Sequence, residues 1–293
     1  MALIDDLKRE ARALFEGKKI DVFIGFKAGT VPHRSQPEFF KDAASLDTMV
    51  FDTTCANNLA VYVKRFMKRG KRVGIAAVGC VSRSLVELIR QTQVPRDRIS
   101  IIGIACGGMI DARKATAGAA DQAADACKRC RHRTPPLADI VLAGMPETVK
   151  SAADPYAAVT AHAARPEKER WEKFKAEMAK CIRCYACRQA CPVCFCERCF
   201  AERNDPPWVG LTDDPTDTAI FQMTRFLHVS GRCVDCGACE RACPAGVDLG
   251  LFRLKIEKDI RDSYGHEAGM DPAAPGAMTS YKTDDTEDFM LHI

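Results

Sequence analysis

The first half of the chain alternates between two apolar periods. Apolar residues spaced three and four apart predict helices, which we place at 3–15, 59–67 and about 85–89. Short apolar runs that end at charged or turn-forming residues predict strands between these helices. The strands are expected at 20–25, 47–52, 72–78, 98–104 and 139–143. Because strands that alternate with helices favour an α/β layer, we expect a mostly parallel sheet.

Three further helices are predicted in the second half of the chain. One over 167–180 is expected to bury Trp171, Phe174 and Met178. A second, over 217–229, carries several apolar residues on one face. They are Ile220, Met223 and Leu227. The third helix is expected around 249–260.

Two runs of cysteine in this half share one spacing, C-x2-C-x2-C-x3-C-P. They are Cys181-x2-Cys184-x2-Cys187-x3-Cys191-Pro192 and Cys233-x2-Cys236-x2-Cys239-x3-Cys243-Pro244. This spacing is typical of bacterial ferredoxins with two clusters, in which the fourth cysteine of each run binds the other cluster. The proline removes a backbone donor and turns the chain after the last ligand.

Crossed ligation defines the ligands of two [4Fe-4S] clusters. We assign the first cluster to Cys181, Cys184, Cys187 and Cys243, and the second to Cys233, Cys236, Cys239 and Cys191. Two structural zinc sites are the alternative, since zinc also takes four thiolates. Zinc explains neither the third cysteine of each run nor the fourth cysteine that a proline follows, so clusters are favoured.

The motifs and the composition divide the chain into four expected segments. An α/β domain covers 1–145, and a linker rich in alanine, proline and charge leads into an entry helix over 146–175. A ferredoxin-like domain with two clusters and an insert covers 176–265. The segment 266–293 is an acidic tail, for which packing on a neighbour or partner and plain disorder are both open.

The other eight cysteines suggest further metal sites. Cys80 and Cys106 each follow the carboxyl end of a buried strand, where ligands gather in an open parallel sheet. Cys55 also follows a strand, and Cys127-x2-Cys130 can reach the same edge. These five cysteines form a predicted third cluster site, with Cys80, Cys106, Cys127 and Cys130 as the first choice of ligands. Buried structural cysteines or a redox thiol pair are the alternatives.

The remaining cysteines follow the first motif directly. Cys194, Cys196 and Cys199 form a candidate for a fourth cluster, for which a fourth ligand must come from elsewhere, for example Cys55. None of the six histidines forms a metal-ligand spacing with another. No Ser-His-Asp or paired-carboxylate arrangement is supported by spacing alone, so we expect no catalytic residues of those kinds.

Composition points to the redox compartment. The chain of 293 residues has 16 cysteines and a formal net charge of +4. Its first residues form a charged amphipathic segment rather than a signal peptide, and no apolar stretch approaches the roughly 18 residues of a membrane span. We therefore expect a cytoplasmic protein with reduced cysteines. Arginines beside the motifs are expected to offset cluster charge, and nothing indicates nucleic-acid binding. They are Arg183, Arg188, Arg198, Arg232 and Arg241.

Two features together resemble the beta-subunit family of deazaflavin-dependent (coenzyme F-420) hydrogenases and dehydrogenases. One is the pair of strands followed by Gly79-Cys80 and Cys106-Gly107. The other is the cysteine-rich run over 181–200, and the second motif at 231–244 is similar to the ferredoxin tail of the same proteins. The form in question accompanies formate dehydrogenase and heterodisulfide-reductase-like complexes of anaerobes.

The resemblance implies an iron–sulfur electron-transfer subunit of a cytoplasmic oxidoreductase complex. Such a subunit relays electrons between a catalytic subunit and a flavin or iron–sulfur partner, with formate dehydrogenase, hydrogenase or heterodisulfide-reductase-like subunits as partners. Family members that use deazaflavin also bind a flavin, which makes FAD a candidate cofactor. The glycines at Gly25-x3-Gly29 and Gly103-x3-Gly107 lack the dinucleotide spacing, so no motif supports a flavin site.

Two enzymatic alternatives remain open at this stage. The chain could be a flavin-containing dehydrogenase subunit that oxidises deazaflavin or a nicotinamide. It could also hold a cluster in its first domain that reduces a disulfide, with Cys55, Cys80 and Cys106 as the candidate residues.

Overall fold

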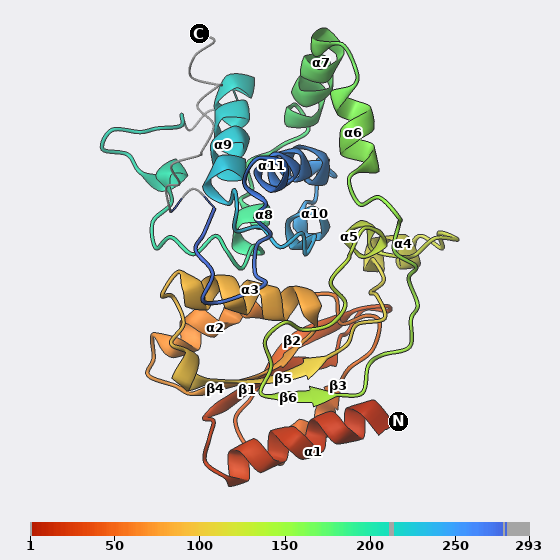
Figure 1. The fold of residues 1–293 in the computed structure, drawn as a ribbon, viewed down its shortest axis with the longest axis vertical. Coiled ribbons are helices and arrows are strands. Elements are labelled where there is room, and N and C mark those ends of the chain that lie inside the picture. The colour runs from red at the N-terminus through yellow and green to blue at the C-terminus, as the bar shows by residue number, and fades with distance from the viewer. Residues whose placement is uncertain (1, 211–213, 278, 280–293) are drawn as a thin grey trace.

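The computed structural model describes residues 2–210, 214–277 and 279 (Figure 1). Within them, one sheet of six strands runs in the order β2-β1-β4-β5-β6, with β3 beside β1. The strands are β1 (Val22–Ala28), β2 (Ser35–Phe40), β3 (Met49–Val50), β4 (Val73–Ala77), β5 (Ile99–Ile104) and β6 (Ile140–Leu142). The pairs β1–β4, β4–β5 and β5–β6 are parallel, whereas β2 and β3 run antiparallel to β1. The predicted mostly parallel sheet is confirmed.

Helices cover both faces of this sheet. Helix α1 (Ala2–Glu16) lies on one face, and α2 (Ala60–Met67) and α3 (Gly79–Arg90) lie on the other (Figure 1). The core between them is apolar, with Leu7, Phe23, Ile75 and Ile101 fully buried. All five residues of β4 are small or apolar and buried, which fits its place in the middle of the sheet, where both of its faces are covered.

Short elements follow the sheet strands. They are η1 (Ser45–Thr48), η2 (Arg96–Arg98), α4 (Ala112–Thr116), α5 (Asp125–Lys128) and α6 (Ala157–Ala163). Two glycines let the chain pass close to the strand ends. A Cβ atom on Gly79, at the start of α3, would clash with the backbone oxygen of His132, and one on Gly107 would clash with that of Pro146. The segment that carries Cys127 and Cys130 therefore packs against the carboxyl edge of the sheet.

The second half is helical and lies on the α2 and α3 side of the sheet (Figure 1). Its elements are α7 (Glu167–Met178), α8 (Ala186–Gln189), η3 (Phe200–Glu202), α9 (Pro215–His228), α10 (Ala238–Ala242) and α11 (Leu249–Tyr264). One small core joins Phe174, Met178, Phe226 and Leu249 with three cysteines of the two motifs. Arg83 of α3 joins the halves, because its guanidinium donates to the backbone oxygens of Val234 and Ala268.

Two expectations need correction. Trp171 is half exposed and stacks on Phe174, because α7 buries only its last turns. The apolar residues expected on one face of α9 are exposed, Ile220 by 43%, Met223 by 47% and Leu227 by 61%, whereas Phe221 and Phe226 of the same helix are buried. The expected strand over 47–52 is reduced to the two residues of β3, after a 3-10 turn.

Two other features of the fold bear on the expectations. Strand β2 was not predicted, and α6 lies within the expected linker. No helix of the described residues is long and apolar enough to cross a membrane. The expected acidic tail lies largely outside the described residues, since only 266–277 and 279 of it are described.

Candidate metal centres

The repeated cysteine motif is also a repeated backbone structure. In the first motif Arg183 and Tyr185 have φ angles of 46° and 59°, and in the second the matching Asp235 and Gly237 have 51° and 65°. A left-handed residue other than glycine costs on the order of 1–3 kcal/mol, so Tyr185 is held there by its surroundings. A short helix follows each loop, and these two helices, α8 and α10, pack against each other. The two loops are thus equivalent halves of one unit.

The first site draws its cysteines from both motifs. Cys181, Cys184 and Cys187 line a small cavity together with Cys243, the last cysteine of the second motif. Two donors point at these sulfur atoms. The Gln222 side-chain amide donates to Sγ of Cys181 at 3.3 Å, and the backbone N–H of Val247 donates to Sγ of Cys243 at 3.4 Å. The structure therefore brings together all four cysteines that the spacing assigns to one cluster.

The second site gathers Cys191 with the first three cysteines of the second motif. Burial raises the pKa of Cys236 to about 11, and the nearby Cys191 and Cys239 add to the rise. Burial likewise raises the pKa of Cys233 well above its usual range, with Cys191 again among the neighbours that contribute. The guanidinium of Arg253 donates from Nη1 to Sγ of Cys233 at 2.9 Å. These thiols need a strong positive charge nearby to ionise, which a bound metal supplies.

A buried arginine lies between these two sites. Arg225 of α9 is only 3% exposed, and it donates from Nη2 to the backbone oxygen of Cys187 at 3.0 Å. Its Nε and Nη1 have no hydrogen-bond partner among the described residues. Burial lowers the pKa of Arg225, but the cysteines around it raise the pKa more, so it stays above the ordinary value. These cysteines are Cys187, Cys191, Cys194 and Cys239.

The unpaired donors of Arg225 test whether a cluster fits here. A buried guanidinium without a counter-charge is strongly unfavourable, because it loses its hydration and gains nothing in return. A cluster ligated by four thiolates carries net negative charge and has sulfur atoms that accept hydrogen bonds. The donors and charge of Arg225 match such a group on either side, so the residues of both sites fit cubane clusters.

A third group of cysteines lies at the carboxyl edge of the sheet. Cys80 opens α3 after β4, Cys106 follows β5, and the loop around α5 brings Cys127 and Cys130 to the same cavity, which Cys55 also lines. The backbone N–H of Gly108 donates to Sγ of Cys106 at 3.4 Å. All five cysteines of the predicted third site therefore line one cavity.

Within this third group, the thiols differ in their surroundings. Burial raises the pKa of Cys80 well above its usual range, and the largest contribution after burial comes from Cys236 of the second motif. Burial also raises the pKa of Cys55 to about 11. Sγ of Cys55 accepts the backbone N–H of Asp52 at 3.4 Å, so this sulfur is partly engaged by its own loop. Cys106 has a contact of the same kind with Gly108, so this contact does not separate the ligands from the fifth cysteine.

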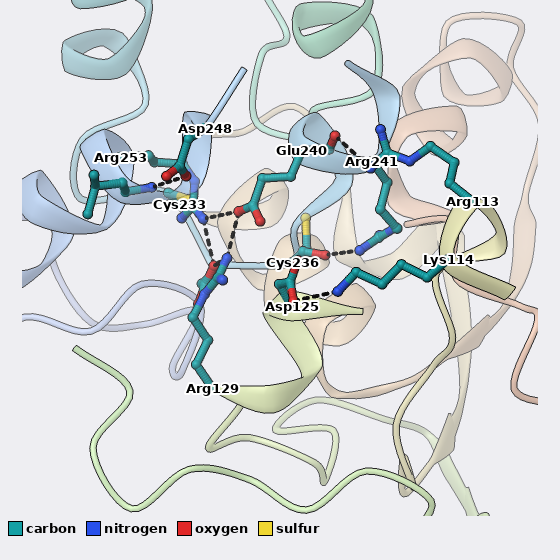
Figure 2. Close-up of polar contacts among 12 residues, drawn as sticks. Arg113, Lys114, Asp125, Arg129, Cys233, Cys236, Glu240, Arg241, Asp248 and Arg253 are labelled. Atoms are coloured by element: carbon teal, nitrogen blue, oxygen red, sulfur yellow. Dashed lines mark hydrogen bonds and ion pairs between the residues drawn. The ribbon is translucent and has the colours of Figure 1, made fainter. Parts of the chain in front are cut away.

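An ionic network joins the third site to the second (Figure 2). Arg129, from the loop between Cys127 and Cys130, binds Asp235 at 2.8 Å and Glu240 at 2.6 Å. Arg253 binds the same two carboxylates at 2.6 and 3.0 Å. Asp235 lies inside the second motif, so one partly buried cluster of two arginines and two acids ties the two cysteine loops together. Because the two loops are held together, Cys236 of the second motif also lines the cavity of the third site.

The candidate for a fourth site is more dispersed. Cys194 is close enough to Cys191 for their thiols to form a hydrogen bond, and this bond and the nearby Arg225 lower the pKa of Cys194. Cys196 is exposed, and it lines a groove with Cys191 and Cys194. Cys199 packs instead beside Tyr185 and Phe200. The groove that Cys194 and Cys196 line does not include Cys199, so the fourth site stays a prediction.

The arginines expected from their place in the motifs only partly face the cysteines. Arg241 does, since it donates to the backbone oxygen of Cys236 at 3.0 Å and lines the cavity of the third site. Arg188 pairs with Glu202, Arg198 donates to Asn204, and Arg183 donates to the backbone oxygen of Gly210. Arg225 and Arg253 were missed because each lies on a helix outside the motifs, 8 residues before Cys233 and 10 residues after Cys243. The signal that identifies these two arginines is a basic residue on the buried side of a helix. Only the structure shows which side of each helix is buried.

The cysteine groups do not resemble sites for single ions. In 2–210, 214–277 and 279, no group of three or more histidine, cysteine, aspartate or glutamate side chains is arranged to hold one metal ion. A cubane is bound at its corners rather than at one central point, so its ligands line a cavity instead of converging.

Comparison with known proteins finds relatives for about a third of the chain. Over 110 residues it is 37% identical to the F420-dependent formate dehydrogenase subunit beta of Methanocaldococcus jannaschii, which is 38% of this chain and 28% of that protein. Over 107 residues it is 29% identical to the F420-dependent formate dehydrogenase 1 subunit beta of Methanococcus maripaludis, covering 36% and 27% of the two chains. The predicted resemblance to the F420-linked beta-subunit family is confirmed for this part.

A relative of another kind also matches. Over 103 residues the chain is 29% identical to a protein of Bacillus subtilis named probable glycolate oxidase iron-sulfur subunit, covering 35% of this chain and 22% of that one. No family model matches the chain. The chain matches less than a third of the length of each of these curated relatives. All three relatives are named as subunits of oxidoreductases, and the Bacillus protein is named as an iron-sulfur subunit.

Proposed function

From its kinship with the F420-linked beta subunits, we propose that this chain is an iron–sulfur electron-transfer subunit of a larger oxidoreductase. One observation carries the proposal. Three cysteines of the first motif and the last cysteine of the second line one cavity, although 56 to 62 positions separate them in sequence. Crossed ligation of this kind is known for proteins that hold two clusters as an electron relay.

The proposed relay has three stations in a fixed order. The first holds Cys181, Cys184, Cys187 and Cys243, and the second holds Cys191, Cys233, Cys236 and Cys239. The third is at the sheet edge, with Cys80, Cys106, Cys127 and Cys130 as the proposed ligands and Cys55 beside them. Each [4Fe-4S] cluster, when bound, supplies one-electron chemistry. The chain contributes ligands, burial from water and the buried arginines that stabilise added negative charge.

The partners follow from the relatives rather than from the site. Because the two archaeal relatives are named as subunits of formate dehydrogenases, we take a formate-oxidising or related redox subunit as the proposed partner. The cytoplasm of an anaerobe is the proposed setting, since reduced cysteines and clusters both require a reducing compartment. FAD stays a candidate cofactor that no motif of the sequence supports.

Crossed ligation gives a direct test of the proposal. In anaerobically purified protein, iron and sulfide would be counted and each cluster followed by its paramagnetic signal after reduction. Cys184→Ala and Cys243→Ala should abolish the same signal, although they lie in different motifs, whereas Cys236→Ala should abolish another. Cys196→Ser is the matched control, because this exposed cysteine is outside all three stations. Loss of different signals in Cys184→Ala and Cys243→Ala, or zinc in place of iron, would contradict the proposal.

A further inference from the structure

A groove rich in positive charge opens beside the second station. Its volume is about 430 Å³, and it runs between α2 of the sheet domain and the segment that follows the first motif. Cys191, one of the proposed cluster ligands, lines it. Five cationic side chains and one carboxylate line the groove, and one of these cations, Arg188, is paired with Glu202 outside it. The cations are Lys64, Arg65, Lys68, Arg69 and Arg188, and the carboxylate is Glu197.

The two walls of the groove are held together by specific contacts. Nζ of Lys64 donates to the backbone oxygen of Phe195 at 2.6 Å and lies over the ring of the same residue. Lys68 forms an ion pair with Glu197. These contacts fix the position of α2 against the segment that carries Cys191, so the groove is a defined feature of the surface. Burial and the neighbouring Lys68 lower the pKa of Lys64, as expected where cations gather.

The rest of the positive charge points to solvent. Arg65 and Arg69 are exposed, and neither has an ion-pair partner among the residues that the structure describes. With Lys64 and Lys68 they occupy positions i, i+1, i+4 and i+5 along α2 and its end, a row about 7 Å long at the helical rise. A small anion is held best by groups that converge on one point. A row of cations along a rim suits a wider acidic surface instead.

From this arrangement we infer that the groove is the docking site for an acidic one-electron carrier protein. Acidic side chains around the redox centre of such a carrier would meet the row of cations, and its centre would then lie over Cys191. One electron passes per encounter: the carrier loses it as the chain gains it, or the reverse, and no bond is made or broken. The inference rests on the proposed function, because it needs a cluster behind Cys191.

The test uses an acidic bacterial ferredoxin as the carrier and the intact chain with its clusters. Arg65→Glu together with Arg69→Glu reverses charge only on the rim and removes no internal contact that the structure records. Arg165→Glu with Lys168→Glu makes the same change of charge on the exposed start of α7, away from the groove, and serves as the matched control. Binding is measured by titration calorimetry and electron transfer by stopped-flow absorbance.

We expect the rim variant to slow electron transfer at 0.01 M salt by about 10- to 100-fold and to weaken binding, because steering by charge gives rate gains of this order. The difference should shrink as salt rises, since the screening length falls from about 30 Å at 0.01 M to about 3 Å at 1 M. The control variant should stay within about 2-fold of the unaltered chain.

Three outcomes would overturn the inference. One is equal loss in the rim and control variants, which would mean that only net charge matters. Another is no loss in the rim variant. The third is saturable binding of pyrophosphate that the rim variant abolishes while the carrier reacts normally, which would assign the groove to a small anion. Iron content and reduction by dithionite, measured on the same samples, separate these results from failure of the proposed function, since absent clusters fail both measurements in every variant.

Discussion

Removing the charge of Arg225 should shift the reduction potentials of two clusters at once. Its guanidinium is buried between cysteines of the first and second stations, and two of its donors have no partner among the described residues. Adding an electron to either cluster adds negative charge beside this cation, which stabilises the reduced form. We therefore expect Arg225→Met, which keeps most of the side-chain length without the charge, to make both clusters harder to reduce.

The size of the shift follows from Coulomb's law. At a separation of about 7 Å and an effective dielectric constant of about 20, unit charges interact by about 2 kcal/mol. For a one-electron couple this corresponds to a potential lower by about 100 mV. The second station should shift more than the first, because Arg225 has two proposed ligands of the second station as neighbours, Cys191 and Cys239, and one of the first, Cys187.

The assay is a redox titration followed by paramagnetic resonance on anaerobic protein. Arg225→Lys keeps the charge and should restore most of the potential, whereas a purely structural role would not be rescued in this way. Arg198→Gln is the matched control, since Arg198 lies among cysteines but is exposed, and its removal should shift neither potential by more than about 20 mV. Potentials unchanged by Arg225→Met at full iron content would refute the reasoning, and so would equal shifts in the lysine and methionine variants.

The other predictions concern the frame around the sites. Gly79→Val should eliminate the third site and lower the melting temperature, because any Cβ at Gly79 clashes with the His132 backbone. The paramagnetic signals of the first two stations should persist. Iron counting checks this prediction, and loss of all clusters would contradict it. Glu177→Gln should lower the free energy of unfolding by about 2–3 kcal/mol at pH 7. The reason is that hydrogen bonds from Lys173, Lys180 and the backbone of Asp248 outweigh the effect of burial and lower the pKa of Glu177 to about 2. A lowered pKa stabilises the fold fully above the unfolded value of about 4.3 and less as pH falls towards 2. The difference in thermal stability between variant and unaltered chain should therefore be constant from pH 8 to 5, and a difference that grows on acidification would be inconsistent with it.

Most of the sheet domain was predictable because its interior is apolar. The strands β1, β4, β5 and β6 each carry the apolar run that predicted them, and the helices on either side show the usual period. Strand β2 was missed because it is an edge strand that is only half buried and contains Pro37, so it has little apolar signal. The expected strand at 47–52 failed since most of it turns before pairing with β1.

The pattern fails in the second half for a physical reason. Helix α9 buries two aromatic side chains, Phe221 and Phe226, and three polar ones, Thr218, Gln222 and Arg225. An interior next to anionic clusters would need donors and positive charge, so polar side chains share the buried side of such a helix with apolar ones. Periodicity located the helix, but its most regular apolar stripe does not mark the buried side. The cysteine spacing was the stronger guide here, because it encodes the geometry of ligands and not that of an apolar core.

The same reasoning explains how the stations are linked. Two arginines lie between the proposed stations: the buried Arg225 between the first and the second, and the partly buried Arg129, which holds the loop of the third to Asp235 in the loop of the second. An electron added to the cluster of one station offsets part of the positive charge of the arginine beside it. That arginine then stabilises the reduced form of the neighbouring cluster less. The potentials of adjacent stations are then coupled, so that one electron in the relay disfavours a second beside it. Buried ion pairs contribute little net stability to a fold. The network around Arg129 is therefore better explained as a device that fixes the distance between two redox sites than as a source of folding energy.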